Sequence, residues 1–152
     1  LAGQYITGSV VNCVLAISVL FAGLYSGLVV AVLSPFFAFL FGIGPKLLPI
    51  VPCIALGNVV YVAVLYVLLR RQNTFRKSLP GLLVGAVSKF LTLYLAVVQI
   101  LIPVLGNALK APQIKTFTVM FSWPQLVTAL LGGVLALLLL PILKKAIKNP
   151  KR

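Results

Sequence analysis

The 152-residue chain contains no aspartate, no glutamate and no histidine, and it has only two cysteines. It therefore has no carboxylate pair for acid–base catalysis, no Ser-His-Asp triad and no histidine-based metal site. Cys13 and Cys53 are too few for a thiolate metal site, and we expect them to be small packing residues. The sequence predicts neither an enzyme nor a metalloprotein, and no cofactor is expected.

Charge is scarce, and all of it is positive. Charged residues make up 9% of the chain, whereas hydrophobic residues make up 62%. Few soluble domains are this apolar, because their surfaces need more charge. Apolar stretches of about 18 residues or more recur along the whole length. The predicted fold class is all-α, a polytopic bundle of transmembrane helices.

The cations cluster between the apolar segments. One group follows the third segment and the other ends the chain: Arg70, Arg71, Arg76 and Lys77, then Lys144, Lys145, Lys148, Lys151 and Arg152. This is the positive-inside pattern, so membrane topology explains the net charge of +13 better than nucleic-acid binding does. The basic tail is also expected to contact anionic lipid head groups of the bilayer.

Five membrane spans can be placed along the sequence. They cover residues 4–22, 28–41, 47–69, 79–102 and 123–140, with turns at 23–27 and 42–46. Pro35 is expected to kink the second span, with neighbouring groups bonding the carbonyl that it frees. Residues 104–121 are more polar and are expected to form an outside loop with a short surface helix. We divide the chain into one transmembrane domain, 1–143, and a basic cytoplasmic tail, 144–152.

Both basic clusters are assigned to the cytoplasmic side of the cell membrane. The C-terminus is then cytoplasmic, and the first visible span begins outside. Because the chain starts at Leu1 without an initiator methionine, we expect a preceding helix of the parent protein to be missing. The remnant of a signal peptide is the alternative.

Lys89 lies near the middle of the fourth predicted span. A cation at bilayer depth costs roughly 2.5–3.5 kcal/mol on insertion scales and marks a functional site by default. At about 1.5 Å per residue, Lys89 is roughly 15 Å from the cytoplasmic end of its helix. No acidic side chain of this chain can pair with it.

Other polar side chains are expected near Lys89. Asn58 lies at a similar depth, Asn12 somewhat nearer the outside, and Gln99 and Gln125 nearer still. On each of two predicted helices, small and polar residues share one face. They are Gly85, Lys89, Thr92, Ala96 and Gln99 on the fourth span, and Gln125, Ala129, Gly132 and Ala136 on the last. These patterns predict a cavity open to the outside, with independent packing roles for the amides as the alternative.

Several features together resemble the substrate-binding (S) subunits of energy-coupling factor (ECF) transporters. Residues 22–27 look like the family's Gly-x-x-x-Gly turn, and the Gly57-Asn58 helix, basic loop and two final helices continue the likeness. Ser88-Lys89-Phe90 and residues 121–125 are similar to one subgroup whose substrate is uncharacterised. The resemblance implies a six-helix fold of which five spans are visible. The missing first helix would be the one that docks onto the coupling subunit.

The resemblance also implies a function and a binding region. Such a subunit captures a small organic micronutrient and works with a coupling transmembrane subunit and two ATPase subunits. ATP hydrolysis must come from these partners, because the chain has no Gly-x-x-x-x-Gly-Lys-Ser/Thr phosphate loop. Metal-uptake members use an N-terminal histidine, so nickel and cobalt are not expected. The family's binding region maps onto Asn58, Lys89, Gln99, Trp123 and Gln125, to which the polar pattern adds Asn12 and Thr92.

Three functional hypotheses follow. In the first, Lys89 binds a carboxylate or phosphate of the solute, or loses its charge when the site is empty. The amides orient the solute and Trp123 stacks on it or closes the site. In the second, the protein is a self-sufficient anion channel or exporter with Lys89 as its selectivity charge. In the third, it is a structural membrane subunit in which Lys89 snorkels or pairs with a partner's acid.

Overall fold

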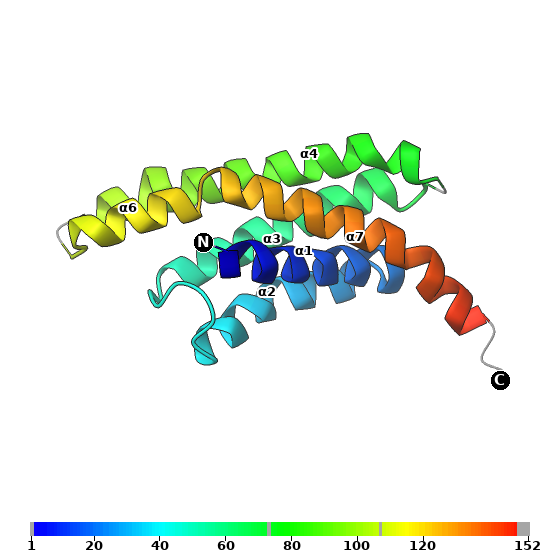
Figure 1. The fold of residues 1–152 in the computed structure, drawn as a ribbon, viewed down its shortest axis with the longest axis horizontal. Coiled ribbons are helices and arrows are strands. Elements are labelled where there is room, and N and C mark those ends of the chain that lie inside the picture. The colour runs from blue at the N-terminus through cyan, green and yellow to red at the C-terminus, as the bar shows by residue number, and fades with distance from the viewer. Residues whose placement is uncertain (1, 73, 107, 149–152) are drawn as a thin grey trace.

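The computed structural model describes residues 2–72, 74–106 and 108–148, and their regular secondary structure is entirely helical. These residues form a bundle built around five main helices (Figure 1). These are α1 (Ala2–Ala22), α2 (Leu24–Leu40), α3 (Ile50–Leu69), α4 (Phe75–Leu93) and α7 (Trp123–Lys148). The π-helix η1 (Tyr94–Leu101) and the single turn α5 (Ile102–Val104) extend α4, and α6 (Ala111–Met120) precedes α7. The predicted all-α fold class is confirmed.

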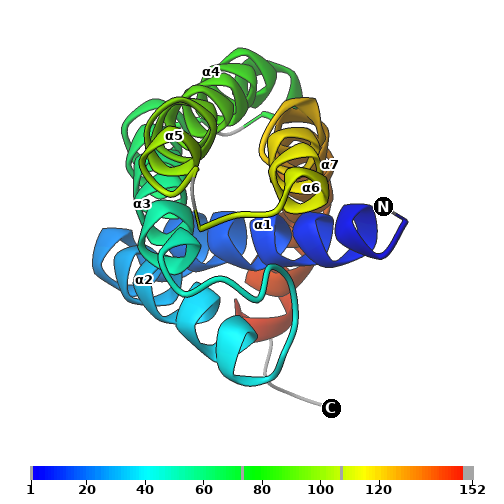
Figure 2. The same ribbon diagram turned by 90° about the vertical axis from the view of Figure 1, so that its left-hand side faces the viewer.

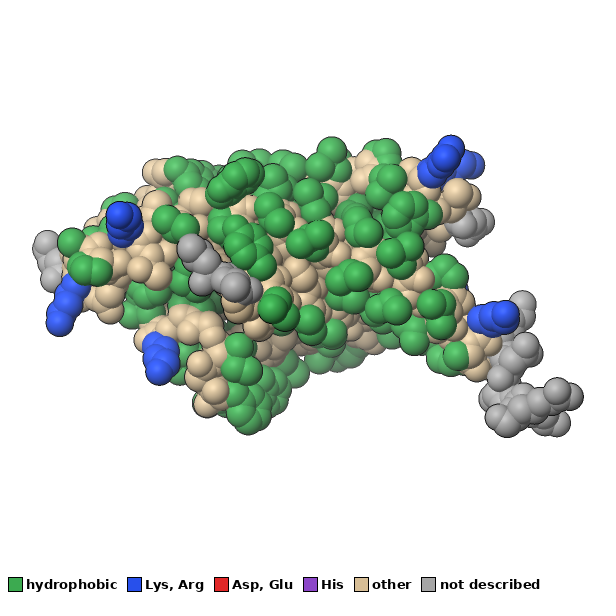
Figure 3. Space-filling model, viewed as in Figure 1, with side chains coloured by type: hydrophobic (Ala, Val, Ile, Leu, Met, Phe, Trp, Pro, Cys, Tyr) green, Lys and Arg blue, Asp and Glu red, His purple; other side chains and the backbone are tan. Residues whose placement is uncertain are grey.

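Within the described residues, four helical segments have the length and composition of membrane spans: Gly3–Ala22, Ile50–Leu69, Phe75–Val104 and Ala111–Ile147. The apolar helix α2 is shorter, at 17 residues. A helix of that length rises about 25 Å, which is the lower limit for crossing the hydrocarbon core. Large apolar side chains cover much of the outer surface seen in Figure 3. A surface of this kind suits lipid rather than water.

The turn between the first two helices is tighter than the sequence predicted. Only Gly23 interrupts the helical chain, and its φ of 96° lies in a region that L side chains rarely adopt. Gly27, the other glycine of the expected turn, lies inside α2. A Cβ at Gly27 would lie 2.7 Å from the Cβ of Val19. Gly27 therefore allows α2 to approach α1 closely instead of turning the chain.

Two further boundaries differ from the prediction. Helix α4 begins at Phe75 instead of Leu79, so the basic loop before it is shorter. Helix α7 does not end near residue 140 but continues through Pro141 to Lys148. Residues 144–148 of the predicted tail are thus helical, and residues 149–152 lie outside the described residues. The short helix expected after residue 104 is present as α6.

The two ends of the bundle carry different numbers of cations. The α3–α4 connection and the C-terminal end of α7 lie at one end, whereas α6 and the α2–α3 connection lie at the other (Figure 1). The described cations of both large basic clusters therefore share one end, and Lys46, Lys110 and Lys115 lie at the opposite end. Figure 3 shows the Lys and Arg side chains at these two ends. The predicted topology assigns the end with both clusters to the cytoplasm, and that orientation stays a prediction.

Close contact between α1 and α7 places Asn12 within the bundle. The view along the long axis in Figure 2 shows α1 crossing beneath the pair formed by α6 and α7. A Cβ at Gly132 would lie 2.6 Å from the Cβ of Asn12 and 2.7 Å from the backbone N of Cys13. Only glycine allows this approach without displacing α1. Asn12 itself is 1% exposed.

Candidate functional site

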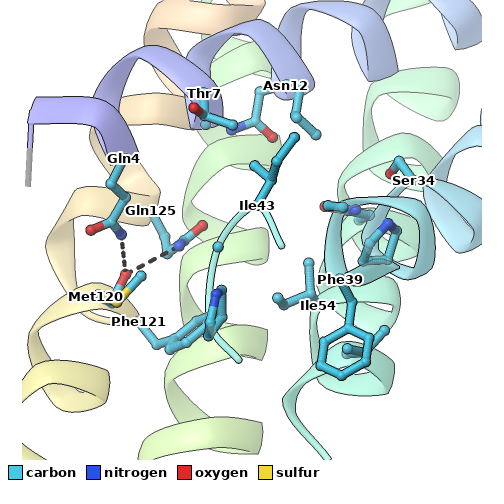
Figure 4. Close-up of a pocket in the computed structure, with 18 of the residues that line it drawn as sticks. Gln4, Thr7, Asn12, Ser34, Phe39, Ile43, Ile54, Met120, Phe121 and Gln125 are labelled. Atoms are coloured by element: carbon cyan, nitrogen blue, oxygen red, sulfur yellow. Dashed lines mark hydrogen bonds between the residues drawn. The ribbon is translucent and has the colours of Figure 1, made fainter. Parts of the chain in front are cut away.

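A cavity of about 610 Å³ lies toward the end of the bundle that carries α6. Its size falls within the range of small-molecule sites in proteins, about 300–1,000 Å³. Part of its wall is drawn in Figure 4. Apolar residues predominate in the wall, and the polar or charged ones are Gln4, Thr7, Asn12, Ser34, Asn58, Lys89, Lys115, Thr116 and Gln125. Helices α1, α2, α3, α4, α6 and α7 all contribute residues.

Lys89 contributes a buried ammonium group to the cavity wall, and its side chain is 3% exposed. Its Nζ donates hydrogen bonds to Oδ1 of Asn12 at 2.5 Å and to Oδ1 of Asn58 at 2.6 Å. The Tyr61 ring centroid lies 5.5 Å from Nζ, which is within the range of a cation–π interaction. One ammonium group therefore connects α1, α3 and α4.

The two asparagines are held with their oxygens toward Lys89. Asn12 Nδ2 donates to Oγ1 of Thr128 at 3.3 Å, and that hydroxyl donates to the carbonyl of Gln125 at 3.2 Å. Asn58 Nδ2 donates to the carbonyl of Ala31 at 3.3 Å. Each amide thus uses its N–H group on another helix and keeps its carbonyl oxygen for the ammonium. Two amide oxygens thus face the buried amino group of Lys89 in a chain that has no acidic residue.

Pro35 explains why the carbonyl of Ala31 can accept a hydrogen bond from Asn58. Proline has no backbone N–H, so the carbonyl four residues earlier in α2 has no partner within the helix. Asn58 supplies the missing donor from α3. The expectation that a neighbouring group would bond the carbonyl freed by Pro35 is confirmed. The proline that interrupts α2 therefore also orients an amide beside Lys89.

Four of the seven predicted site residues line the cavity: Asn12, Asn58, Lys89 and Gln125. The other three lie outside its wall. Thr92 Oγ1 donates to the carbonyl of Ser88, exposed Gln99 donates to the Tyr94 hydroxyl, and Trp123 is 62% exposed. Beyond Leu93 the chain is a π-helix, whose wider turns displace Gln99 from the face predicted at 3.6 residues per turn. Trp123 has the exposed position typical of an interfacial tryptophan.

The sequence did not predict that α2 and the α2–α3 connection contribute residues to the cavity wall. Ser34 and Phe39 line the cavity from α2, and residues 43–45 line it from the connection. The sequence feature that could have indicated this contribution is Ser34-Pro35, where a polar residue and a proline interrupt an apolar span. Positive φ angles at Gly42 and Gly44, 70° and 91°, turn the connection back toward the bundle.

Two glutamines connect the end of α6 to the main bundle. Gln4 of α1 and Gln125 of α7 both donate from Nε2 to the carbonyl of Met120, at 2.8 and 3.1 Å. Figure 4 shows these bonds converging on one oxygen in the cavity wall. Phe117 and Phe121 are buried in the same apolar cluster. Helix α6 is thus anchored beside the cavity rather than lying free on the surface.

The chemistry of the cavity suits binding rather than catalysis. Among residues 2–72, 74–106 and 108–148, no three His, Cys, Asp or Glu side chains are grouped to hold a metal ion. The wall combines apolar side chains with a buried cation and a few amides, which is the composition of a small-molecule site. The fold and the cavity together define a multi-pass membrane protein with a solute-sized chamber.

Comparison with known families agrees with this class. Residues 4–144 match the family model of the ECF transporter, substrate-specific component. The match covers nearly the whole chain, and the protein belongs to this family. It is therefore an S component, a non-enzymatic subunit that captures substrate for an ECF importer. No curated protein and no solved structure gives a significant match.

Proposed function

We propose that this S component captures a small organic anion from outside the cell and holds its acidic group against Lys89. The observation that carries the proposal is a buried ammonium on the wall of an open cavity. That ammonium belongs to a chain with no Asp or Glu anywhere in its sequence. A positive charge on Lys89 would have only neutral hydrogen-bond partners, which is an incomplete electrostatic arrangement. An anionic solute would complete it.

Lys89 retains a donor for such a solute. A lysine ammonium has three N–H groups, and the two asparagine oxygens account for two of them. The third can make a charge-assisted hydrogen bond to a carboxylate or phosphate oxygen. Since opposite charges attract more strongly away from water, the contact would contribute both affinity and a preference for anions.

The remainder of the cavity suits an organic body attached to the acid. Phe39, Ile54 and Phe121 belong to a largely apolar wall, and burial of apolar solute surface against it is favourable by about 25 cal/mol per Å². A volume of about 610 Å³ accommodates a molecule of vitamin size but is larger than an inorganic anion requires. We therefore propose an organic micronutrient as the substrate.

Import would depend on partner subunits. Family membership supports assembly with a coupling transmembrane subunit and two ATPase subunits, and the chain itself lacks a phosphate-binding loop. The proposed topology in the cell membrane places the α6 end outside and the C-terminus in the cytoplasm. In this orientation the cavity faces the side from which the solute arrives.

A retention experiment tests the proposal. The protein is purified in detergent from cells grown on rich medium, and the small molecules released on denaturation are quantified by mass spectrometry. Lys89→Gln keeps a hydrogen-bond donor for Asn12 and Asn58 but removes the charge. Lys110→Gln is the matched control, since this exposed lysine lies on the same end of the bundle but outside the cavity wall.

We expect the wild-type protein and Lys110→Gln to release an acidic organic molecule in similar amounts. We expect Lys89→Gln to release at least tenfold less, because a hydrogen bond to a charged group is lost. Equal retention by Lys89→Gln and Lys110→Gln, with both variants folded, would show that Lys89 does not bind the solute.

A further inference from the structure

We propose that the protein binds an anionic phospholipid at the C-terminal end of α3, in a pocket that holds the lipid phosphate against two arginines. This pocket has a volume of about 290 Å³ and is lined by Tyr66, Val67, Arg70 and Arg71. It shares no residue with the solute cavity, which lies toward the opposite end of the bundle. The proposal is therefore independent of the solute that Lys89 binds.

The pocket lies on the face of α3 that points away from the core. The Val67 side chain is 72% exposed and both arginines are exposed, whereas the neighbouring Leu65 and Leu69 are buried. Helix α4 packs against the buried face, where a Cβ at Gly81 would collide with the Leu69 side chain. The pocket thus opens on the outer surface of the bundle, which faces lipid in a membrane.

Tyr66 holds the Arg70 side chain in place. Arg70 Nη1 donates to the Tyr66 hydroxyl at 2.7 Å, and the guanidinium carbon lies 4.9 Å from the centroid of the Tyr66 ring. This bond uses one of the five N–H donors of the guanidinium, and the Tyr66 hydroxyl can still donate its own proton. A guanidinium held in this way suits two oxygens of a phosphate group.

The positive charge of the pocket attracts an anion from outside the chain. The sequence contains no Asp or Glu side chain that could pair with Arg70 or Arg71. The C-terminal end of a helix carries about half a negative charge, which is much less than the two positive charges of the arginines. Other Lys and Arg side chains at the same end of the bundle add to the attraction (Figure 3).

An apolar strip on the outward face of α3 leads from the pocket toward the middle of the membrane. Its residues follow one another at intervals of about one turn: Leu56, Val60, Ala63 and Val67. The side chains at its two ends, Leu56 and Val67, are 52% and 72% exposed. The strip is about 16 Å long, which is close to half of the hydrocarbon core of about 30 Å. An acyl chain of one leaflet therefore has the length to cover it.

A phospholipid satisfies both the pocket and the strip. Its phosphate lies at the level where a spanning helix ends, and its acyl chain extends from there into the hydrocarbon core. A soluble phosphate would pair with the arginines but leave the strip uncovered. The same chemistry explains why the arginines directly follow an exposed apolar residue at the end of the helix.

Native mass spectrometry of the full chain in detergent tests the proposal. The probes are dioleoyl phosphatidylglycerol, which is anionic, and dioleoyl phosphatidylcholine, which has the same acyl chains and no net charge. Excess ammonium phosphate is the soluble competitor. The pocket variant combines Arg70→Gln with Arg71→Gln. Its matched control combines Arg76→Gln with Lys77→Gln, which removes two positive charges at the same end of the bundle but outside the pocket wall.

We expect the wild-type protein to bind the anionic lipid about tenfold more tightly than the zwitterionic lipid, and excess phosphate not to displace it. The pocket variant should lose this preference, whereas the control should change the affinity less than about twofold. Tyr66→Phe keeps the ring but removes the hydroxyl that orients Arg70, so it should weaken binding of the anionic lipid about two- to threefold.

Equal affinity of the wild-type protein for both lipids would overturn the proposal, and that measurement does not depend on the folding of any variant. Displacement by phosphate would identify a site for small anions instead of a lipid. Equal losses in the pocket variant and its control would assign the attraction to the net charge of this end. Unchanged lipid binding by the pocket variant, together with loss of a co-purifying ATPase complex, would make the arginines a docking site for a protein partner and contradict the lipid site.

Discussion

Pro35 of α2 and Asn58 of α3 are linked through a single backbone carbonyl. Pro35 cannot donate to the carbonyl of Ala31, and Asn58 Nδ2 donates to it instead at 3.3 Å. The same amide accepts a hydrogen bond from Lys89 through its Oδ1. Asn58 therefore connects the interruption of α2 at Pro35 to the buried side chain of Lys89.

This link predicts non-additive effects of substitution at the two positions. Asn58→Leu should destabilise the protein by about 1–3 kcal/mol, because it leaves the Ala31 carbonyl unpaired and removes one acceptor from Lys89. Pro35→Ala restores a backbone donor within α2, so in the Asn58→Leu background it should recover about 1 kcal/mol. Reversible unfolding in detergent micelles of the wild type, both single variants and the double variant measures the coupling. If the changes in unfolding free energy of the two single variants simply add in the double variant, Pro35 and Asn58 are not coupled through the Ala31 carbonyl.

Thr128 should position Asn12 without contacting the solute. Thr128→Val removes the oxygen that accepts from Asn12 Nδ2, so the amide is free to turn its N–H group toward Lys89. We expect solute retention to fall about five- to tenfold, whereas Thr128→Ser, which keeps the hydroxyl, should retain near wild-type amounts. Retention measured by mass spectrometry distinguishes these outcomes. A loss for Thr128→Ser with near wild-type retention for Thr128→Val would instead assign the effect to packing of the threonine methyl group.

Gly132 should tolerate no side chain. Because a Cβ there would lie 2.6 Å from the Cβ of Asn12, Gly132→Ala must push α1 away from α7. We expect a loss of about 1–3 kcal/mol of stability and a parallel loss of solute retention. Gly3→Ala is the control, since a Cβ at Gly3 of α1 would have no neighbour within 4 Å. Thermal unfolding in detergent that gives similar midpoints for both variants would contradict the close approach of α1 and α7.

The proposed topology can be tested by labelling single cysteines in intact cells. In a background with Cys13→Ala and Cys53→Ala, Lys110→Cys should react with a membrane-impermeant maleimide added outside. Lys145→Cys should react only after the cells are opened. The positive-inside pattern supports this result, because it assigns the end with both large basic clusters to the cytoplasm. Labelling of Lys145→Cys in intact cells would reverse the orientation and place the cavity on the inner side.

The sequence predicted the site best where its signals were unusual for a membrane span. Lys89, Asn12 and Asn58 stood out in apolar helices, and helix direction and depth placed Asn58 level with Lys89 and Asn12 somewhat nearer the outside. The structure brings all three together. Gln99 was misplaced because a run of apolar residues gives no indication of a π-helix, and the helical face was drawn at 3.6 residues per turn. The contribution of Ser34 was missed because the cavity wall depends on how α2 folds back after Gly23, which is a tertiary property.

The most direct measurement is a structure of the purified protein with its retained solute. The account predicts an acidic oxygen of the solute within about 3 Å of Lys89 Nζ, while Asn12 and Asn58 keep their oxygens toward the same ammonium. A solute bound elsewhere, with Lys89 still bonded only to the two asparagines, would contradict it.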